Sequence, residues 1–323
     1  MKKVIIAAVV VFMVMGTALF AEGQQEYPSR TIEIVVPGGA GGGSDTAARV
    51  LQPLLAKELG VDIKVTNVPG GGHSKAVVYT QEAPADGYTL EMHSGSDIIL
   101  DVFNKLDYKF TEESIPLARL QWESAVLWTG KNGRFDSIQE LIAYAQKNPG
   151  DVTCAISTPG GNDDAIAGTF AKEAGIKLTL VPMDGGGEMM AAVMARHVDL
   201  MLEDASAVGD MMSSGEIIPL VVVRDDRIDS PELKDVPSTG ELGLNVPLAT
   251  FRAFAVKKGT PQEAVDILVA ALKAAYDSPE YKKWEKENQL HLRKGWAGPD
   301  ELADQWKESI DTYTKIFTEL GRL

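Results

Sequence analysis

The sequence predicts an α/β fold divided into two lobes, and three observations carry this prediction. Four strand-like runs are each followed by a glycine-rich turn and then by a helix-like run. The turns fall in two separate regions of a 323-residue chain, which is long enough for two domains. The alternation of strand and helix patterns favours parallel strands joined by helical crossovers. We therefore expect two α/β lobes, each contributing two glycine turns.

The first glycine turn covers residues 37–45 and reads Pro-Gly-Gly-Ala-Gly-Gly-Gly-Ser-Asp. It follows the apolar run 31–36 and precedes apolar residues at helical spacing between 47 and 59. Ser44 and Asp45 are expected to cap this helix, because both residue types accept hydrogen bonds from its first N–H groups. A glycine turn at a helix start leaves N–H groups unpaired at the positive end of the helix dipole, which suits an anion.

Three further turns, at residues 68–74, 157–163 and 182–188, have the same arrangement. Two interpretations remain open. Glycine turns can simply join strands to helices in any α/β fold, or the four turns can line one ligand cleft. Successive glycines in all four favour the shared cleft, because a bare backbone can approach a ligand closely.

The remaining segments show strand and helix patterns in alternation, with a polar loop at residues 225–245. Pro261 is expected at the first position of a helix. We expect strands at residues 88–93, 117–129, 217–223 and 250–256, and helices at residues 73–83, 136–148, 261–276, 279–288 and 299–319.

The strand at 117–129 is expected to pass into the second lobe, and the strand at 250–256 to return to the first. This assigns residues 23–125 and 250–323 to the first lobe and residues 126–249 to the second. Two crossings, near 124–128 and 247–251, would form a hinge around which the lobes close on a ligand.

The N-terminus has the pattern of a secretory signal peptide at residues 1–22. Lys2 and Lys3 precede an almost wholly apolar run at 4–20, with cleavage expected near Ala21. An uncleaved membrane anchor is the alternative, which a run of this length barely allows. The single cysteine, Cys154, cannot form an internal disulfide and lies far from this segment. We therefore expect an extracytoplasmic protein without a lipid anchor, in which Cys154 is a small core residue.

The charge and the motifs exclude several function classes. The net charge is −15, and removal of Lys2 and Lys3 takes it to −17, which argues against a nucleic-acid partner. No glycine turn contains the Gly-Lys-Ser/Thr of nucleotide-binding loops, and the four histidines lack His-Glu-x-x-His spacing. No Gly-x-Ser-x-Gly elbow occurs either. The sequence therefore predicts no cofactor, no metal and no catalytic residues.

Two polar positions outside the glycines stand out. Glu203 and Asp204 follow an apolar strand, so they either face a cleft at the end of that strand or lie in a solvated turn. His73 adjoins the second glycine turn and is either a donor to a ligand or a solvated loop residue.

In their order and spacing, these motifs resemble the periplasmic substrate-binding proteins of tripartite tricarboxylate transporters, often called Bug proteins. The resemblance covers residues 27 to about 306. Its markers are Tyr27-Pro28, the 37–45 turn, Asn67-x-Pro69-Gly70-Gly71-Gly72, Asp86-Gly87-Tyr88-Thr89-Leu90, Gly185-Gly186-Gly187-Glu188, Val198-Asp199-Leu200-Met201 and Asp235-Val236-Pro237-Ser238-Thr239.

The resemblance implies a two-lobed periplasmic-binding-protein fold of the class II type, usually monomeric. Such proteins bind organic carboxylates and deliver them to a membrane permease of a large and a small subunit. The first-lobe turns would grip one carboxylate, and the second lobe would contact the rest of the ligand. The residues expected to line the site are Gly39, Ala40, Gly41, Ser44, Asp45, Gly70, Gly71, Gly72, His73, Ser94, Ser157, Thr158, Gly161, Asn162, Gly186, Glu203 and Asp204.

The second lobe departs from the family pattern of Ser-x-Gly-x-Gly-Ser/Thr followed by a histidine. Pro159 replaces a glycine, Asn162 replaces the hydroxyl residue and Ala165 stands where the histidine would be. The function expected is therefore periplasmic capture of a small organic carboxylate for transport, with the carboxylate itself unspecified. Two alternatives remain: a ligand-sensing protein that docks on a membrane receptor, and a hydrolase of small carboxylate esters.

Overall fold

The computed structural model describes residues 26–157, 159–183 and 185–323. The expected signal peptide at 1–22 and Thr158 of the expected site lie outside the described residues.

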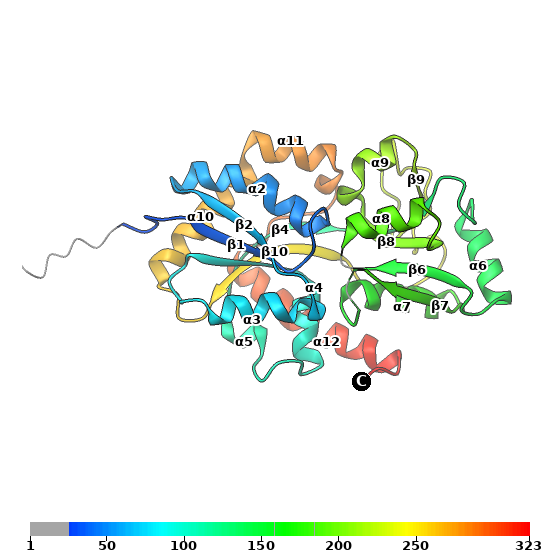
Figure 1. The fold of residues 1–323 in the computed structure, drawn as a ribbon, viewed down its shortest axis with the longest axis horizontal. Helices are drawn as coiled ribbons and strands as arrows, with labels where there is room; N and C mark the ends of the chain where they lie inside the picture. Colours follow the sequence, from blue (N-terminus) through cyan, green and yellow to red (C-terminus); the bar gives the residue numbers. More distant parts are fainter. Residues whose placement is uncertain (1–25, 158, 184) are drawn as a thin grey trace, which may run out of the picture.

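Two five-stranded sheets form the centres of two lobes that lie end to end (Figure 1). In each sheet, three parallel strands are continued by two strands of alternating direction. The predicted α/β two-lobed fold is confirmed. The first sheet has the order β2 (Ile63–Asn67), β1 (Ile32–Val36), β3 (Thr89–His93), β10 (Thr250–Lys257), β4 (Ser114–Glu123), and the second has the order β7 (Leu178–Pro182), β6 (Val152–Ile156), β8 (Leu200–Asp204), β5 (Ala125–Gly130), β9 (Ile217–Val222).

The chain crosses between the sheets at two neighbouring points. The segment expected as one strand at 117–129 is two strands, β4 and β5, which belong to different sheets and are separated only by Ser124. The return crossing is the long loop between β9 and β10. Glu123 at the end of β4 pairs with Thr250 at the start of β10, so the two crossings lie side by side.

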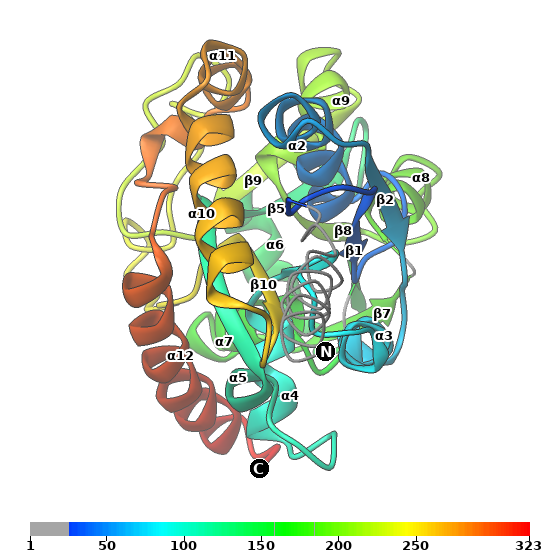
Figure 2. The same ribbon diagram turned by 90° about the vertical axis from the view of Figure 1, so that its left-hand side faces the viewer.

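Helices cover both faces of each sheet because alternate strand residues point to opposite sides. On β10, Phe254 belongs to the core beneath α2, α10 and α11, whereas Ala253 belongs to the core beneath α3, α4, α5 and α12. Figure 2 shows α10 and α12 running beside the first sheet. The helices of the first lobe are α2 (Gly43–Leu59), η1 (Gly71–His73), α3 (Ser74–Glu82), α4 (Gly95–Val102), α5 (Phe110–Glu113), α10 (Gln262–Asp277), α11 (Pro279–Glu287), η3 (Leu290–Leu292) and α12 (Pro299–Glu319).

The second lobe has a core on each face of its sheet. Trp128 of β5 and Met189 of α8 belong to one core, whereas Cys154 of β6 is fully buried in the other, as expected for a core residue. The helices of this lobe are α6 (Ile138–Lys147), α7 (Asn162–Glu173), α8 (Gly186–Met194), η2 (Ala205–Ala207) and α9 (Gly209–Ser213).

The C-terminal helix α12 contacts both lobes, which was not expected from the sequence. It packs on α4 and β4 of the first lobe. Near its end, Tyr313 Oη donates a 2.8 Å hydrogen bond to Asn162 Oδ1 of α7, and Glu319 forms a 2.7 Å ion pair with Lys172. The last helix therefore spans the junction between the two lobes.

Two predicted helix starts are wrong in detail. Helix α2 begins at Gly43, so its N-cap is Gly42, and neither Ser44 nor Asp45 caps it. Asp45 instead accepts the Gly41 N–H at 3.0 Å through Oδ2, because its position in the first turn points the carboxylate back at the glycine loop. Pro261 is the N-cap of α10 and not its first helical residue.

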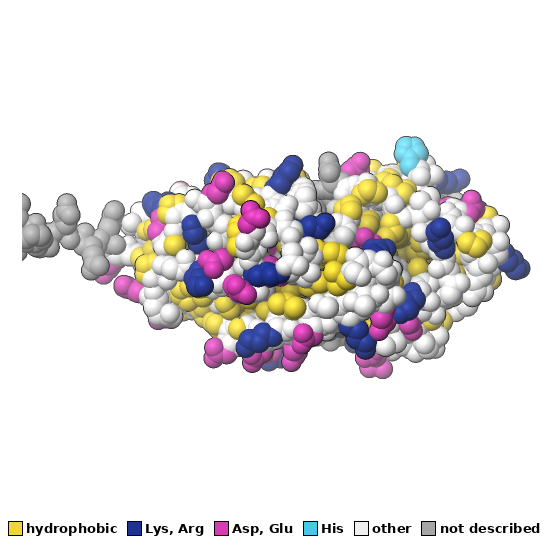
Figure 3. Space-filling view, turned by 90° about the horizontal axis from the view of Figure 1, so that it is seen from below, with side chains coloured by type: hydrophobic (Ala, Val, Ile, Leu, Met, Phe, Trp, Pro, Cys, Tyr) yellow, Lys and Arg dark blue, Asp and Glu magenta, His cyan; other side chains and the backbone are white. Residues whose placement is uncertain are grey.

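Charged side chains of both signs are interspersed over the face shown in Figure 3. Among the described residues, no helix is both long and apolar enough to cross a bilayer.

Candidate ligand-binding site

A cavity of about 520 Å³ lies between the two lobes. Its walls come from the residues that follow or end the parallel strands: Pro37 after β1, Pro69 after β2 and Ser94 after β3 in the first lobe. The second-lobe wall comes from Ser157 after β6, Pro182 of β7 and Glu203 of β8. The carboxyl ends of parallel strands are the usual place for a ligand in an open α/β sheet.

Several helices begin at this cavity without a side-chain cap. Gly42, Gly161 and Gly185 are the N-caps of α2, α7 and α8, and none of the three has a side-chain cap hydrogen bond. The first N–H groups of such helices need other partners, and the helix dipole makes an anion favourable there. Helix α4 differs, because Ser94 caps it and accepts the Ser96 N–H at 3.3 Å.

The glycine turns of the two lobes touch each other beside the cavity. A methyl group added to Gly186 would lie 3.3 Å from Gly42 Cα, and one added to Gly185 would lie 3.4 Å from Gly39 Cα. A methyl group added to Gly72 would lie 3.5 Å from the carbonyl oxygen of Pro159. The lobes therefore meet backbone to backbone, and larger residues at these positions would hold them apart.

Most of the residues expected at the site line this cavity. Ala40, Gly41 and Gly161 are not among its lining residues, although each adjoins one or belongs to the same turn. Thr158 lies outside the described residues. The expected residues that line the cavity are Gly39, Ser44, Asp45, Gly70, Gly71, Gly72, His73, Ser94, Ser157, Asn162, Gly186, Glu203 and Asp204.

Sequence reasoning missed other lining residues. Many of them belong to the four glycine turns, and assigning every residue of each turn to the site would have predicted them. The other six lie outside those turns: Ser96, Lys105, Ala125, Leu202, Thr250 and Arg252. The missed residues are Pro37, Gly38, Gly42, Gly43, Pro69, Ser96, Lys105, Ala125, Pro159, Asp163, Pro182, Met183, Gly185, Leu202, Thr250 and Arg252.

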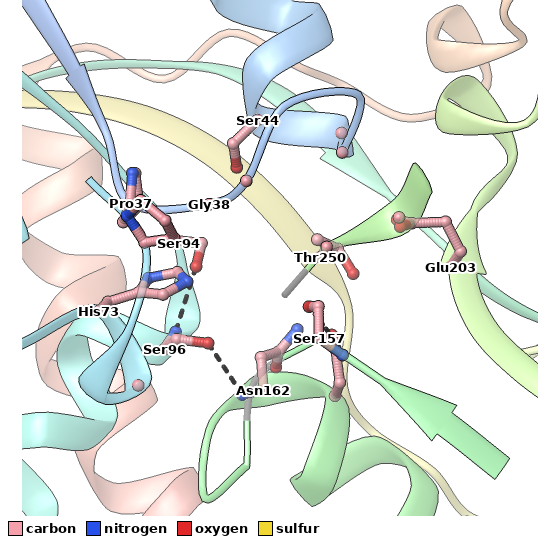
Figure 4. Close-up of a pocket in the computed structure, with 18 of the residues that line it drawn as sticks. Pro37, Gly38, Ser44, His73, Ser94, Ser96, Ser157, Asn162, Glu203 and Thr250 are labelled. Carbon is pink, nitrogen blue, oxygen red and sulfur yellow. Dashed lines mark hydrogen bonds between the residues drawn. The ribbon is translucent and has the colours of Figure 1, made fainter. Parts of the chain in front are cut away.

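The first-lobe wall carries a polar group of side chains. Figure 4 shows His73, Ser94 and Ser96 together on one side of the cavity, opposite Glu203. His73 Nδ1 lies 2.9 Å from Oδ2 of the buried Asp97. Ser96 Oγ accepts the backbone N–H of Asn162 at 3.0 Å, which links the first lobe to the start of α7.

The second-lobe wall is acidic. Arg252 Nη2 of β10 lies 2.8 Å from Asp204 Oδ2, and both side chains are buried. Among the described residues, Glu203 forms no ion pair of this kind. Burial, followed by repulsion from Asp204 and Asp163, raises the pKa of Glu203 to about 8. In its protonated form, which this shift favours, the Glu203 carboxyl group can donate a hydrogen bond.

The described residues contain no group of histidine, cysteine, aspartate and glutamate side chains arranged to hold a metal ion. The arrangement is suited instead to binding a small anionic molecule between two lobes through neutral donors. Fold and cavity together define the class of two-lobed solute-binding proteins.

Comparison with known proteins gives the family. The sequence profile of the tripartite tricarboxylate transporter family receptors matches residues 47–302. The chain belongs to this family. It is 29% identical to the protein BugT of Bordetella pertussis over 256 residues, which cover 78% of each chain.

Solved structures agree with the fold. MatC from Rhodopseudomonas palustris, solved with bound malate, superposes with a TM-score of 0.81 at 25% identity and covers 90% of this chain and 99% of its own. A second R. palustris protein, solved with adipate, gives a TM-score of 0.83 at 24% identity and covers 92% of this chain and 99% of its own.

Proposed function

We propose that this chain is a periplasmic solute-binding protein that captures a small organic carboxylate between its lobes and delivers it to a tripartite tricarboxylate-type permease. The observation that carries the proposal is the convergence of uncapped helix starts on one cavity of about 520 Å³. Backbone N–H groups bind a carboxylate without a net positive charge, so a strongly acidic protein can still hold an anion.

The ligand class is supported by the relatives. MatC is a structural relative that holds malate, and the second R. palustris structure holds adipate. In this chain the first-lobe turns at 37–45 and 69–73 would hold one carboxylate. The second-lobe residues Asn162, Glu203 and Asp204 would contact the remainder of the ligand.

The permease would recognise the closed form of the protein, in which the two lobes meet around the ligand. Residues 23–125 and 250–323 would act as one lobe and residues 126–249 as the other, with the crossings at Ser124 and before Thr250 as the hinge. A ligand that contacts both lobes shifts the open–closed equilibrium by its higher affinity for the closed form. The protein would work as a monomer, without catalysis, after removal of an N-terminal signal peptide.

A thermal-shift screen of residues 23–323 tests this proposal, with mono-, di- and tricarboxylates, amino acids and sugars as ligands. A ligand that binds only the folded state raises the unfolding midpoint by mass action. We expect a shift with one class of carboxylate. Shifts with sugars alone would contradict carboxylate binding, and turnover of carboxylate esters by the same sample would favour an enzyme instead.

A further inference from the structure

The contacts between the two lobes differ on two sides of the cavity. Where the glycine turns meet, backbone approaches backbone, and a methyl group added to Gly186 would lie 3.3 Å from Gly42 Cα. Beside α7, buried apolar side chains of both lobes form one continuous core, which contains Ile98 of α4, Trp306 of α12 and Ile166 of α7. The cores on the opposite faces of the two sheets are separate from each other. Separation of the lobes beside α7 would therefore expose apolar side chains, whereas at these glycines only backbone would part.

The C-terminal helix α12 runs along this continuous core from one lobe to the other (Figure 1). In the first lobe, the Trp306 ring lies 5.1 Å from the rings of His93 and Phe110, measured between centroids. At the other end of the helix, a methyl group added to Gly168 of α7 would lie only 3.0 Å from Leu320 Cδ1. The helix contains no glycine, and its proline is its first residue, so it has no internal point that favours a kink.

Two ion pairs also join the end of the chain to α7. Glu319 lies 2.7 Å from Lys172, and Arg322 is paired with Asp164. The Glu319–Lys172 pair is exposed on both sides, and such a pair contributes little to stability. The stronger part of this contact is therefore its buried part, which consists of the apolar core and one hydrogen bond.

That hydrogen bond ends on a residue of the cavity. Tyr313 Oη donates to Asn162 Oδ1 at 2.8 Å, and Asn162 is 2% exposed and lines the cavity. Asn162 Nδ2 donates to the carbonyl oxygen of Ala249, in the return crossing, at 3.4 Å. Its backbone N–H donates to Ser96 Oγ of α4 at 3.0 Å, as Figure 4 shows. One residue of the ligand site is thus attached to the first lobe, to the return crossing and to the last helix.

We propose that the C-terminal end of α12, residues 313–322, is a third connection between the lobes, which stays formed while the cleft opens at its glycine turns. The proposal rests on the proposed function, because it describes how the cavity admits a ligand. Since Asn162 also contacts Ala249, the third connection lies beside the return crossing, where a rotation about the crossings moves atoms least. A ligand that contacts Asn162 therefore meets an amide that is already held in place, which lowers the ordering cost of binding.

Two variants and one matched control test the third connection. Tyr313→Phe keeps the aromatic ring but removes the hydroxyl group that Asn162 accepts from. Gly168→Val places a side chain against Leu320 and should push the end of the chain away from α7. The control is Tyr281→Phe, which also removes a buried hydroxyl group. Tyr281 Oη donates to the carbonyl oxygen of Leu120 within the first lobe and does not line the cavity.

The first measurement needs no ligand. Hydrogen–deuterium exchange of the unliganded wild type should be slow in residues 313–320, although helix ends usually fray, because this segment stays packed on α7. We expect exchange there to be roughly three- to tenfold faster in Tyr313→Phe, faster still in Gly168→Val and unchanged in Tyr281→Phe. Rapid exchange in the wild type, or equal exchange in all four proteins, would overturn the inference whatever the ligand is.

The second measurement prevents movement at one side of the cavity at a time. A short bis-maleimide joins Lys172→Cys to Glu319→Cys across the third connection, or Ala40→Cys to Gly187→Cys across the glycine turns. A methyl group added to Gly187 would lie 3.7 Å from the Ala40 carbonyl oxygen, so the second pair lies where the turns meet. The native Cys154 is fully buried and should not react.

Calorimetric titration with malate and adipate then compares each cross-linked protein with the same double variant before cross-linking. We expect the cross-link at the third connection to leave the affinity unchanged, and the cross-link at the glycine turns to reduce binding at least tenfold. Without cross-links, Tyr313→Phe should bind roughly three- to tenfold more weakly than the wild type, and Tyr281→Phe should bind equally well. Loss of binding on cross-linking the third connection would show that the lobes must separate there, and would overturn the inference.

The outcomes separate the two proposals. If the wild type binds a carboxylate and the cross-link at the third connection abolishes binding, the inference is wrong while the proposed function stands. If the exchange result is as expected but no carboxylate binds to the wild type, the proposed function is wrong, and the third connection stands as a feature of the fold.

Discussion

Arg252 of β10 and Asp204 of β8 form a buried ion pair, with 2.8 Å between Nη2 and Oδ2, that joins the first sheet to the second. Both residues lie next to the crossings, because Thr250 pairs with Glu123 and Asp204 pairs with Ala125. Both also line the cavity. The pair therefore holds the two lobes together at the cavity, beside the two crossings about which the lobes would rotate.

Removal of one partner of this pair should be strongly destabilising. Asp204→Ala leaves the Arg252 guanidinium buried without its counter-ion, which costs roughly 3–5 kcal/mol in the free energy of unfolding. Urea denaturation measures this loss. The control is Asp304→Ala, which breaks an exposed pair with Lys307 and should leave the stability close to wild type. Equal effects of the two substitutions would contradict the role given to Asp204.

Closure should depend on the absence of a side chain at Gly186. A methyl group there would lie 2.5 Å from Glu203 Oε2 and 3.3 Å from Gly42 Cα. The Glu203 side chain can move, but the Gly42 backbone cannot move unless the lobes separate. We expect Gly186→Val to weaken ligand binding at least tenfold, because the closed form becomes less populated. In the presence of ligand, small-angle scattering should give a larger radius of gyration for Gly186→Val than for the wild type.

The control for closure is Gly298→Ala, because an added methyl group at Gly298 would meet no atom within 4 Å and its φ is −76°. This variant should bind and close as the wild type does. Wild-type affinity in Gly186→Val would show that the lobes do not need to meet at these glycines.

Stability should depend on pH through Glu123. Burial, followed by repulsion from Asp204, raises the pKa of this carboxyl group from 4.5 to about 8. The native state therefore keeps a proton that the unfolded chain releases between these values. The resulting stabilisation is fully present below 4.5 and is lost as the pH rises to about 8.

Glu123→Gln removes this ionisation while keeping the shape of the side chain. The free energy of unfolding of the variant, relative to that of the wild type, should rise by of the order of a few kcal/mol between about pH 5 and about pH 9. Urea denaturation at several pH values gives the comparison. Parallel pH profiles for the two proteins would refute the assignment of the proton to Glu123.

Cys154 should be unreactive in the folded protein. It is fully buried in β6, and burial raises the pKa of its thiol to about 12, so the reactive thiolate is scarce. A thiol reagent should label it only when the protein unfolds, at a rate that follows urea concentration. Rapid labelling of the native protein would show that the second-lobe core opens locally.

The sequence predicted the parts of the fold that have local signals. Successive glycines between strand and helix patterns marked most of the cavity wall, and hydrophobic periodicity placed most strands and helices. The exact helix starts were less predictable, because Asp45 hydrogen-bonds to a neighbouring loop N–H and leaves the cap to Gly42. Serine and aspartate favour both kinds of local bond.

The parts that could not be predicted depend on contacts between distant segments. His73 and Asp97 are 24 positions apart, and Arg252 and Asp204 are 48 apart. Tyr313 and Asn162, which join α12 to the second lobe, are 151 apart. No sequence motif predicts which residue each of these contacts. The pairs can therefore be identified only from the folded structure.

Isothermal titration of residues 23–323 tests the central claim most directly. Each carboxylate that raises the unfolding midpoint should be titrated beside its amide, which has the same shape without the charge. We predict binding of one molecule per chain, with the carboxylate bound at least tenfold more tightly than the amide. Equal binding of the two, or binding of neither, would contradict the claim that this cleft captures a carboxylate.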